Sequence, residues 1–189
     1  MNQKQLSETI AFIQRAESLK NTIRYAHTST GRPESTAEHT WRLCLLIMVL
    51  SKNLEGADPY KLLRLAVVHD LGEAVCGDVP AIDQAEGDNK DELERQGLSD
   101  LCDGLPDDVR AHIMALWDEY AAGSTLEAVI VKGLDKLETI MQHNRGKNPP
   151  NFNCDFNLDY GREYTQAHPL LTQMRELVDI STRENSERS

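Results

Sequence analysis

The stretch that decides the fold is residues 35–54, which read STAEHTWRLCLLIMVLSKNL. Ser35 and Glu38 stand three residues apart, the spacing of a capping box, so we expect a helix to begin here. Residues 43–50 are apolar without interruption, which predicts a helix that is apolar on all sides and lies at the centre of the core. The run is much shorter than the ~20 residues that a membrane-spanning helix needs. We therefore expect a core helix in a protein that does not enter the membrane.

Apolar residues recur at three- and four-residue spacing on both sides of this stretch, which is typical of amphipathic helices. Helices are predicted before residue 20, from Asp58, over residues 90–101, from Pro106, over residues 124–143 and from Pro169. Loops are predicted at residues 21–33, 77–89 and 144–166, and we find no alternating pattern that would indicate a strand. The expected fold class is all-α, a single compact bundle of six or seven helices.

The length of 189 residues corresponds to one domain, and 40% hydrophobic with 27% charged residues is close to the norm for a globular protein. We expect that domain to span residues 1–180. Residues 181–189 are polar, so we expect them to form a frayed, disordered tail.

The net charge and the positions of the cysteines indicate which partners and which cellular compartment to expect. A formal net charge of −11 would repel a polyphosphate backbone, so we expect no nucleic-acid partner. The N-terminus lacks the apolar segment of a secretory signal. The four cysteines are far apart and form no CxxC pair, which is typical of a reduced, cytoplasmic protein.

Four polar residues fall on apolar helix faces: His39, His69, Asp70 and Asp135. Each alone could be an ordinary buried residue with a local hydrogen-bond partner. Together, two imidazoles and two carboxylates from three helices could converge on one divalent cation, and such donors suit manganese, iron, cobalt or zinc. Two carboxylates would cancel the charge of the ion, so a phosphate dianion would need further positive charge.

Three segments carry a resemblance to a known family: RPESTAEHTWR at residues 32–42, VVHDLGEAVCGD at residues 67–78 and VKGLDKLE at residues 131–138. They resemble the signature segments of HD-domain metal-dependent phosphohydrolases, most closely the compact branch typified by 5′-deoxynucleotidases. The resemblance covers about residues 19–143. It implies an HD-domain bundle, a homodimer, and one divalent ion (Mn, Co, Mg, Fe or Zn) held by His39, His69, Asp70 and Asp135.

The same resemblance implies catalytic roles for two further acids. Glu73 lies four residues after His69, so on a helix it would reach the same face and could orient a water and handle its proton. Asp78 follows a glycine where the chain leaves the helix, and could position the water or protonate the leaving oxygen. The alternatives are a solvated helix glutamate and an ordinary turn aspartate.

Basic and aromatic residues before the first signature segment are candidates for substrate binding. The resemblance places Arg24 on the substrate phosphate, where a guanidinium can bind two oxygens at once, and adds Lys20. Related deoxynucleotidases often carry a tryptophan after this arginine, near the sugar, where it disfavours a 2′-hydroxyl. Here the residue is Tyr25, so we expect weaker discrimination between deoxyribose and ribose.

The expected function is metal-dependent hydrolysis of (deoxy)nucleoside 5′-monophosphates to nucleoside and phosphate. One alternative is an HD-domain hydrolase that acts on another phosphorylated metabolite or an alarmone. The other is a non-catalytic, metal-stabilised scaffold, against which Arg24, Glu73 and Asp78 argue because a structural metal site would not need them.

Overall fold

The structure is a computed structural model, which describes residues 1–80, 82 and 89–187. Helices and two short strands follow one another in this order: α1 Gln3–Ala16, η1 Glu17–Lys20, β1 Ile23–His27, β2 Pro33–Ser35, α2 Thr36–Leu50, η2 Ser51–Asn53, α3 Pro59–Val68, α4 Glu73–Cys76, α5 Lys90–Leu101, α6 Asp107–Ala122, α7 Leu126–Arg145, α8 Phe156–Asp159, α9 Arg162–Thr165 and α10 Pro169–Ser186. The predicted helical fold class is confirmed.

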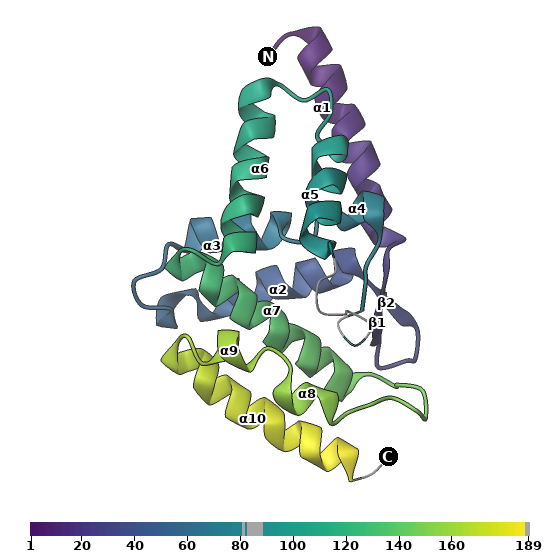
Figure 1. Cartoon of the computed structure of the whole chain (residues 1–189), viewed down its shortest axis with the longest axis vertical. Coiled ribbons are helices and arrows are strands. Elements are labelled where there is room, and N and C mark those ends of the chain that lie inside the picture. Colours follow the sequence, from purple (N-terminus) through teal and green to yellow (C-terminus); the bar gives the residue numbers. More distant parts are fainter. Residues whose placement is uncertain (81, 83–88, 188–189) are drawn as a thin grey trace.

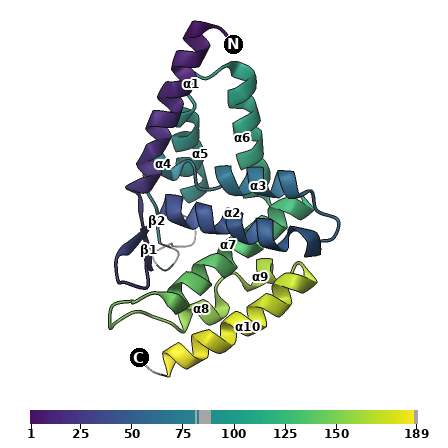
Figure 2. The ribbon, with the colours of Figure 1, turned by 180° about the vertical axis from the view of Figure 1, so that it is seen from behind.

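The helices form three tiers along the long axis of the molecule (Figure 1). Helices α1, α5 and α6 stand at the N-terminal end, α2, α3 and α7 cross the middle, and α8 to α10 close the C-terminal end. The view from behind shows α2 and α3 side by side across the middle tier (Figure 2). No described helix is both long enough and apolar enough to cross a membrane.

Two hydrophobic clusters hold these tiers together. The larger one joins α2, α3, α7 and α10 through buried residues such as Leu43, Leu62, Leu134 and Leu171. The smaller one joins α1, α5 and α6, with Leu98 completely buried. The spacing of apolar residues at three and four positions therefore forms one face on each long helix, and these faces meet.

Local capping explains where several helices begin. The Ser35 hydroxyl accepts from the backbone N–H of Glu38, and the Glu38 carboxylate accepts from the backbone N–H of Ser35, so the predicted capping box starts α2. Helix α3 begins after Asp58 with a proline at its first position, as predicted.

Helix α7 does not begin with a capping box, although Ser124 and Glu127 stand three residues apart, the spacing of one. The cap of α7 is Thr125, whose hydroxyl accepts from the backbone N–H of Ala128. Glu127 does not close a box with Ser124, because its carboxylate accepts instead from the backbone N–H of Asp58 and pairs with Lys61 at 3.2 Å. This tertiary contact ties the start of α7 to the start of α3.

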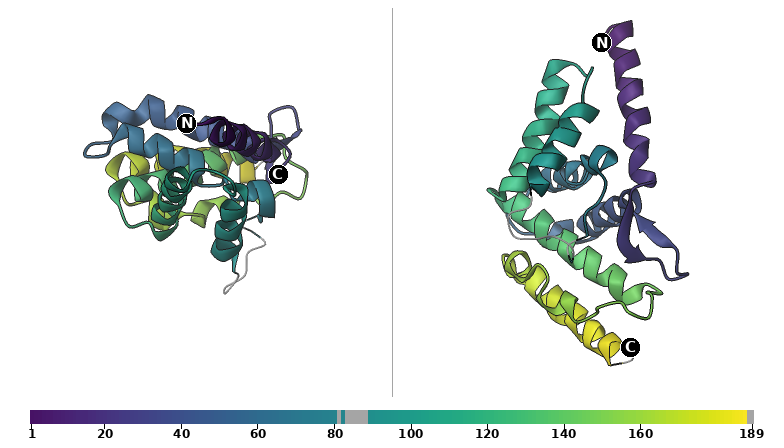
Figure 3. Two further views of the ribbon diagram at one scale, coloured as in Figure 1. Left: turned by 90° about the horizontal axis from the view of Figure 1, so that it is seen from above. Right: turned by 45° about the vertical axis from the view of Figure 1, so that its right-hand side comes forward.

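The predicted loop at residues 21–33 contains a small antiparallel hairpin of β1 and β2. The strands are short and mixed in polarity, so they carry no readable alternation. The hairpin stands at the edge of the middle tier (Figure 3), and it brings β1 against α7.

The expectation that the apolar stretch of α2 is buried on all sides is wrong. His39, Leu43 and Ile47 are buried, but Leu45, Met48 and Val49 are 45%, 62% and 69% exposed. Helices α3 and α7 cover only one side of α2. The most buried long helix is α7, which carries buried residues along almost its whole length.

The expectation of a frayed tail is also wrong for residues 181–186. Helix α10 continues to Ser186. Thr182 is completely buried, and its hydroxyl donates to the side chain of Asn144 on α7. Residues 188–189 lie outside the described residues.

Candidate metal and phosphate site

Three of the four predicted ligands, His39, His69 and Asp70, have ligand atoms within 4.8 Å of one another, and the fourth, Asp135, lies against His39. His39 lies in the first turn of α2, His69 and Asp70 directly follow α3, and Asp135 lies in α7. His69 Nε2 is 2.9 Å from Asp70 Oδ2, and His39 Nε2 is 3.1 Å from Asp135 Oδ1 and 3.7 Å from Asp70 Oδ2. Segments far apart in the sequence thus bring two nitrogens and two oxygens together.

The donor atoms fit a divalent ion. In the described part of the chain, Nε2 of His39 and Nε2 of His69 are buried without a hydrogen-bond partner, which is costly for a polar atom unless something else binds it. Ligands held at about 2.1 Å from one ion and at right angles lie ~3 Å apart. Two of the observed separations, 2.9 Å and 3.1 Å, match that spacing, and the third, 3.7 Å, is longer.

The rings of both histidines are held by contacts on their other nitrogen. Nδ1 of His39 bonds to the carboxylate of Glu138, which is 1% exposed and pairs in turn with Arg42 at 3.1 Å. Nδ1 of His69 donates to the carbonyl of Ala66 at 2.7 Å. Each contact turns Nε2 towards the cluster, the arrangement usual for histidine ligands of metals.

Asp135 is oriented in the same way. Its Oδ2 accepts from the Tyr120 hydroxyl at 3.1 Å and from Lys136 Nζ at 3.0 Å. Its Oδ1 is left facing His39.

Glu73 is buried beside the cluster, at the start of α4. Its Oε2 accepts from the Thr36 hydroxyl at 3.0 Å. Burial, followed by the charges of Asp70 and Asp78, raises the pKa of Glu73 to about 9. Glu73 is therefore not the solvated glutamate that was the alternative reading.

Asp78 lies just beyond α4, half-buried, and lines the same cavity. Burial raises the pKa of its carboxyl above the usual value, although the charge of Arg24 opposes the shift.

Arg24 reaches the cluster from β1. One guanidinium nitrogen donates to the Thr139 hydroxyl at 3.0 Å, and another is 3.4 Å from Asp70 Oδ2. A third lies 3.8 Å from Glu34, whose carboxylate is 2% exposed. Burial lowers the pKa of Arg24, but Asp70 and Asp135 raise it more, so the group stays charged.

A cavity of about 310 Å³ opens on the cluster. Its described lining includes four cationic and five acidic side chains, so basic groups gather here despite the net charge of −11 of the chain. They are Arg24, Lys90, Lys132 and Lys136, with Asp70, Glu73, Asp78, Asp135 and Glu163.

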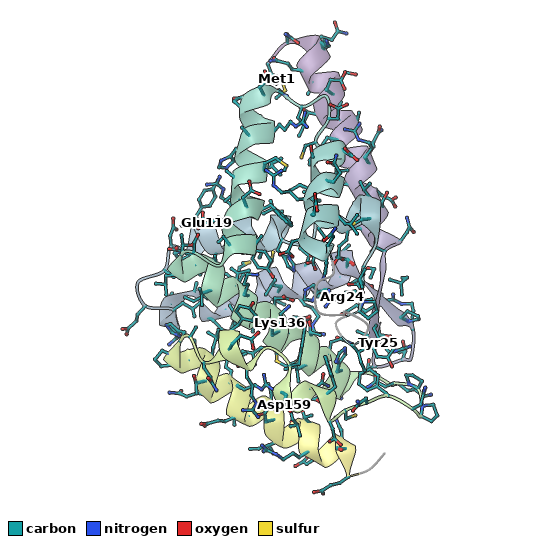
Figure 4. The ribbon with its side chains drawn as sticks, viewed as in Figure 1. Met1, Arg24, Tyr25, Glu119, Lys136 and Asp159 are labelled. Carbon is teal, nitrogen blue, oxygen red and sulfur yellow. The ribbon has the colours of Figure 1, made fainter. Side chains whose placement is uncertain are left out.

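Not all of the predicted substrate-binding residues lie at the cavity. Tyr25 lines the cavity, and its ring stacks on Phe152 with centroids 5.4 Å apart. Lys20 does not line the cavity: its side chain is 68% exposed and lies 4.0 Å from Glu17. In Figure 4, Arg24 and Lys136 lie near the centre of the molecule, and Tyr25, the residue after Arg24 on β1, lies further to the right.

Several residues at the site had not been predicted. Lys132 and Lys136 flank Asp135 in the quoted segment VKGLDKLE, and their four-residue spacing on one helix face is a signal that sequence reasoning could have used. Glu138 lies in the same segment. Tyr120 and Phe152 have no local signal, since they reach the site only through the packing of α6 and of the segment after α7.

The chain is similar to several known proteins. A family model described as an HD domain matches residues 16–175. The human 5′-deoxynucleotidase HDDC2 is 32% identical over 135 residues, which cover 70% of this chain but only 65% of the human protein. The mouse protein of the same name is 28% identical over 182 residues, covering 94% of this chain and 88% of the mouse protein.

A solved structure shares the fold over nearly the full length. It is a predicted metal-dependent phosphohydrolase from Magnetospirillum magnetotacticum MS-1, with a TM-score of 0.83 and 26% identity, covering 96% of this chain and 95% of that one. Because the family model spans most of the chain, this chain belongs to the HD-domain family.

Proposed function

We propose that this protein is a metal-dependent phosphomonoesterase that hydrolyses (deoxy)nucleoside 5′-monophosphates to nucleoside and phosphate. The observation that carries the proposal is the convergence of the His39, His69, Asp70 and Asp135 cluster with Arg24 and buried Glu73 at one cavity. The names of the human and mouse relatives support the substrate class.

The cluster would hold one divalent ion, and the nitrogen and oxygen donors suit Mn, Co, Fe or Zn, with Mg as a harder alternative. Such an ion supplies a Lewis acid that offsets charge on the phosphoryl group. Arg24 binds phosphoryl oxygens, since Thr139 and Asp70 hold its guanidinium at the cavity wall.

Glu73 and Asp78 handle the protons. Glu73 takes a proton from the attacking water, whose oxygen bonds to phosphorus as the bond to the 5′-oxygen breaks. Burial raises the pKa of Glu73, and an ion held by the cluster would lower it again, so Glu73 would then be in the form that accepts a proton. Asp78, which lines the same cavity, gives a proton to the leaving 5′-oxygen.

The nucleoside would lie against the aromatic end of the cavity, formed by Tyr25, Phe152 and His143. Stacked rings offer flat apolar surface for a base or sugar.

A panel of mononucleotides and other phosphoesters, assayed with Mn, Co and Mg, tests the proposal. We expect metal-dependent phosphate release that is largest with 5′-mononucleotides. Asp135→Ala and His39→Ala should each lose bound metal and activity but keep helical content. Absence of phosphate release from every mononucleotide, in protein of verified metal content, would contradict the proposed function.

The proposal extends to assembly and location: a cytoplasmic homodimer without nucleic-acid or membrane partners. Trp41, Leu45, Met48 and Val49 share one exposed face of α2, and the same face of a second copy would cover it in an isologous contact. The net charge of −11 disfavours binding to nucleic acid or to an anionic membrane surface.

A further inference from the structure

Lys132 differs from the other cations that line the cavity. Arg24, Lys90 and Lys136 each lie within 4.0 Å of a carboxylate, namely Asp70, Glu94 and Asp135. Among the described residues, Lys132 has no carboxylate within that distance. Its Nζ instead lies over the rings of Tyr120 and Tyr164, 4.6 Å and 5.4 Å from their centroids.

The surroundings of Lys132 disfavour its positive charge. Burial and the neighbouring Lys136 lower the pKa of this ammonium, and the charges of Asp91, Asp135 and Glu94, none of them in contact with it, offset only part of that shift. Two aromatic faces attract a cation but offer no negative charge and no acceptor oxygen. An anion at this end of the cavity would therefore be stabilised by the lysine and would stabilise it in turn.

The order of side chains along α7 places this lysine relative to the cluster. Lys132, Asp135, Thr139 and His143 follow at three- or four-residue spacing, so they lie along one face of the helix. At 1.5 Å per residue, Lys132 lies about 5 Å before Asp135 and His143 about 12 Å after it. The aromatic end of the cavity and Lys132 are thus on opposite sides of the cluster.

We propose that Lys132, framed by Tyr120 and Tyr164, forms a second anion subsite that takes a further phosphoryl group joined to the one at the cluster, as in a nucleoside 5′-diphosphate. The inference rests on the proposed function for the position of the first phosphoryl group. With the nucleoside against Tyr25 and the α-phosphoryl group at the cluster, the β-phosphoryl group extends along α7 to Lys132.

Binding to the metal-loaded protein tests the subsite, at a fixed free Mn²⁺ concentration set by a metal buffer. The probes for calorimetry are inorganic phosphate, pyrophosphate and a deoxynucleoside α,β-methylene diphosphate, which resists hydrolysis. We expect Lys132→Gln to weaken both two-phosphorus probes about 10-fold or more, the effect of one lost charged hydrogen bond, and to leave phosphate affinity unchanged. Lys132→Arg should retain most of the affinity.

Lys90→Gln is the matched control, because it removes one positive charge from the same cavity at another place. It should change affinity for the three probes by similar factors. Lys132→Met, which keeps an unbranched apolar side chain between the two tyrosines, replaces the glutamine variant if that variant unfolds.

Two results would overturn the subsite. An equal loss of phosphate and pyrophosphate affinity in Lys132→Gln would place the lysine on the first phosphoryl group. Unchanged affinity for every probe would leave Lys132 a packing contact of Tyr120 and Tyr164. Release of phosphate from mononucleotides is measured separately, so failure of the subsite and failure of the proposed function remain distinguishable.

Discussion

At the level of single residues, the cluster is built from side chains that are each held at one end. Glu138 holds His39, the carbonyl of Ala66 holds His69, and Tyr120 with Lys136 holds Asp135. Each remaining donor atom faces the others. Buried groups arranged in this way need little reorganisation on binding an ion, which favours affinity.

Glu138→Gln tests the contribution of the carboxylate behind His39. The amide oxygen of glutamine can still accept a hydrogen bond from Nδ1. The negative charge of Glu138, which makes Nε2 of His39 a stronger ligand for a metal ion, is lost. We expect metal affinity to fall about 10- to 100-fold with helical content unchanged. Titration of the metal-free protein with Co²⁺, followed by its visible absorption, measures both affinity and ligand geometry.

An unchanged dissociation constant and spectrum in Glu138→Gln would show that Glu138 only fills space. Arg42→Met is the control, since Arg42 contacts Glu138 but lies one step further from the ligand. Arg42→Met should lower metal affinity less than Glu138→Gln does.

Glu73→Ala should keep the metal but lose turnover, because Glu73 lies beside the cluster and acts on water. Elemental analysis and kcat for a mononucleotide measure the two effects. Glu163→Ala removes an acid from the exposed part of the same cavity and should keep most of the activity. A Glu73→Ala protein with kcat near the wild-type value would exclude the proton-handling role.

Tyr25 should make this protein less selective for deoxyribose than relatives with a tryptophan there. A desolvated ribose hydroxyl beside an indole costs ~1–3 kcal/mol, or about 5- to 150-fold, whereas the tyrosine hydroxyl can bond to it. His27 does not line the cavity, so it does not replace the indole. We expect Tyr25→Trp to raise the ratio of kcat/KM for dAMP over AMP.

Comparing the dAMP/AMP ratio of kcat/KM in the wild type with that in Tyr25→Trp decides the role of Tyr25. A wild-type preference for dAMP above about a hundredfold, unchanged in Tyr25→Trp, would show that another residue sets sugar choice.

At the level of elements, the close packing of α4 against α5 fixes the position of Glu73, the first residue of α4. Gly72 and Gly97 face each other between α4 and α5, and a Cβ atom at Gly72 would lie 2.2 Å from the carbonyl oxygen of Glu94. Only glycine allows this contact. The short helix α4 is therefore held against α5, with Glu73 at its start turned inward.

The start of α2 should show a pH-dependent contribution to stability through Glu38. Its ion pair with Arg32, followed by the Ser35 backbone contact, lowers the pKa of Glu38 to about 2. A depressed pKa in the folded state stabilises the fold above the unfolded value of 4.5, and the effect is lost as the pH falls towards 2.

Glu38→Gln should therefore lower Tm at pH 7, by an amount that corresponds to at most about 1 kcal/mol for this exposed pair. The difference from the wild type should shrink between pH 4.5 and pH 2. Thermal unfolding at several pH values measures it, and a difference independent of pH would assign the effect to the cap rather than to the charge.

At the level of the whole molecule, the exposed apolar face of α2 predicts a dimer in solution. Val49→Glu puts a charge in the centre of that face, so sedimentation should show a monomer where the wild type is a dimer. Ile10→Glu on α1, with 51% exposure, is the control and should leave the dimer intact. A monomeric wild type, or a dimeric Val49→Glu protein, would contradict the predicted interface.

Much of the fold and part of the site could be predicted from local spacing. The capping box at Ser35, the cap and proline at Asp58, and the apolar periodicity of α6 act within a few residues, so their signals are local. The hairpin of β1 and β2 and the exposed side of α2 could not be predicted, because short polar strands lack a pattern and an apolar run does not reveal which side is covered.

The sequence by itself determined the helical fold class, the HD-domain resemblance and which histidines and aspartates were candidate ligands. Only the tertiary structure decided that Lys20 lies away from the cavity, that Glu138 holds His39 and that Lys132 has aromatic neighbours. The reason is physical: the contacts that orient the site, such as Arg24 with Thr139 and His39 with Glu138, join residues 115 and 99 positions apart. Such contacts depend on how whole helices pack, and no spacing along the chain encodes them.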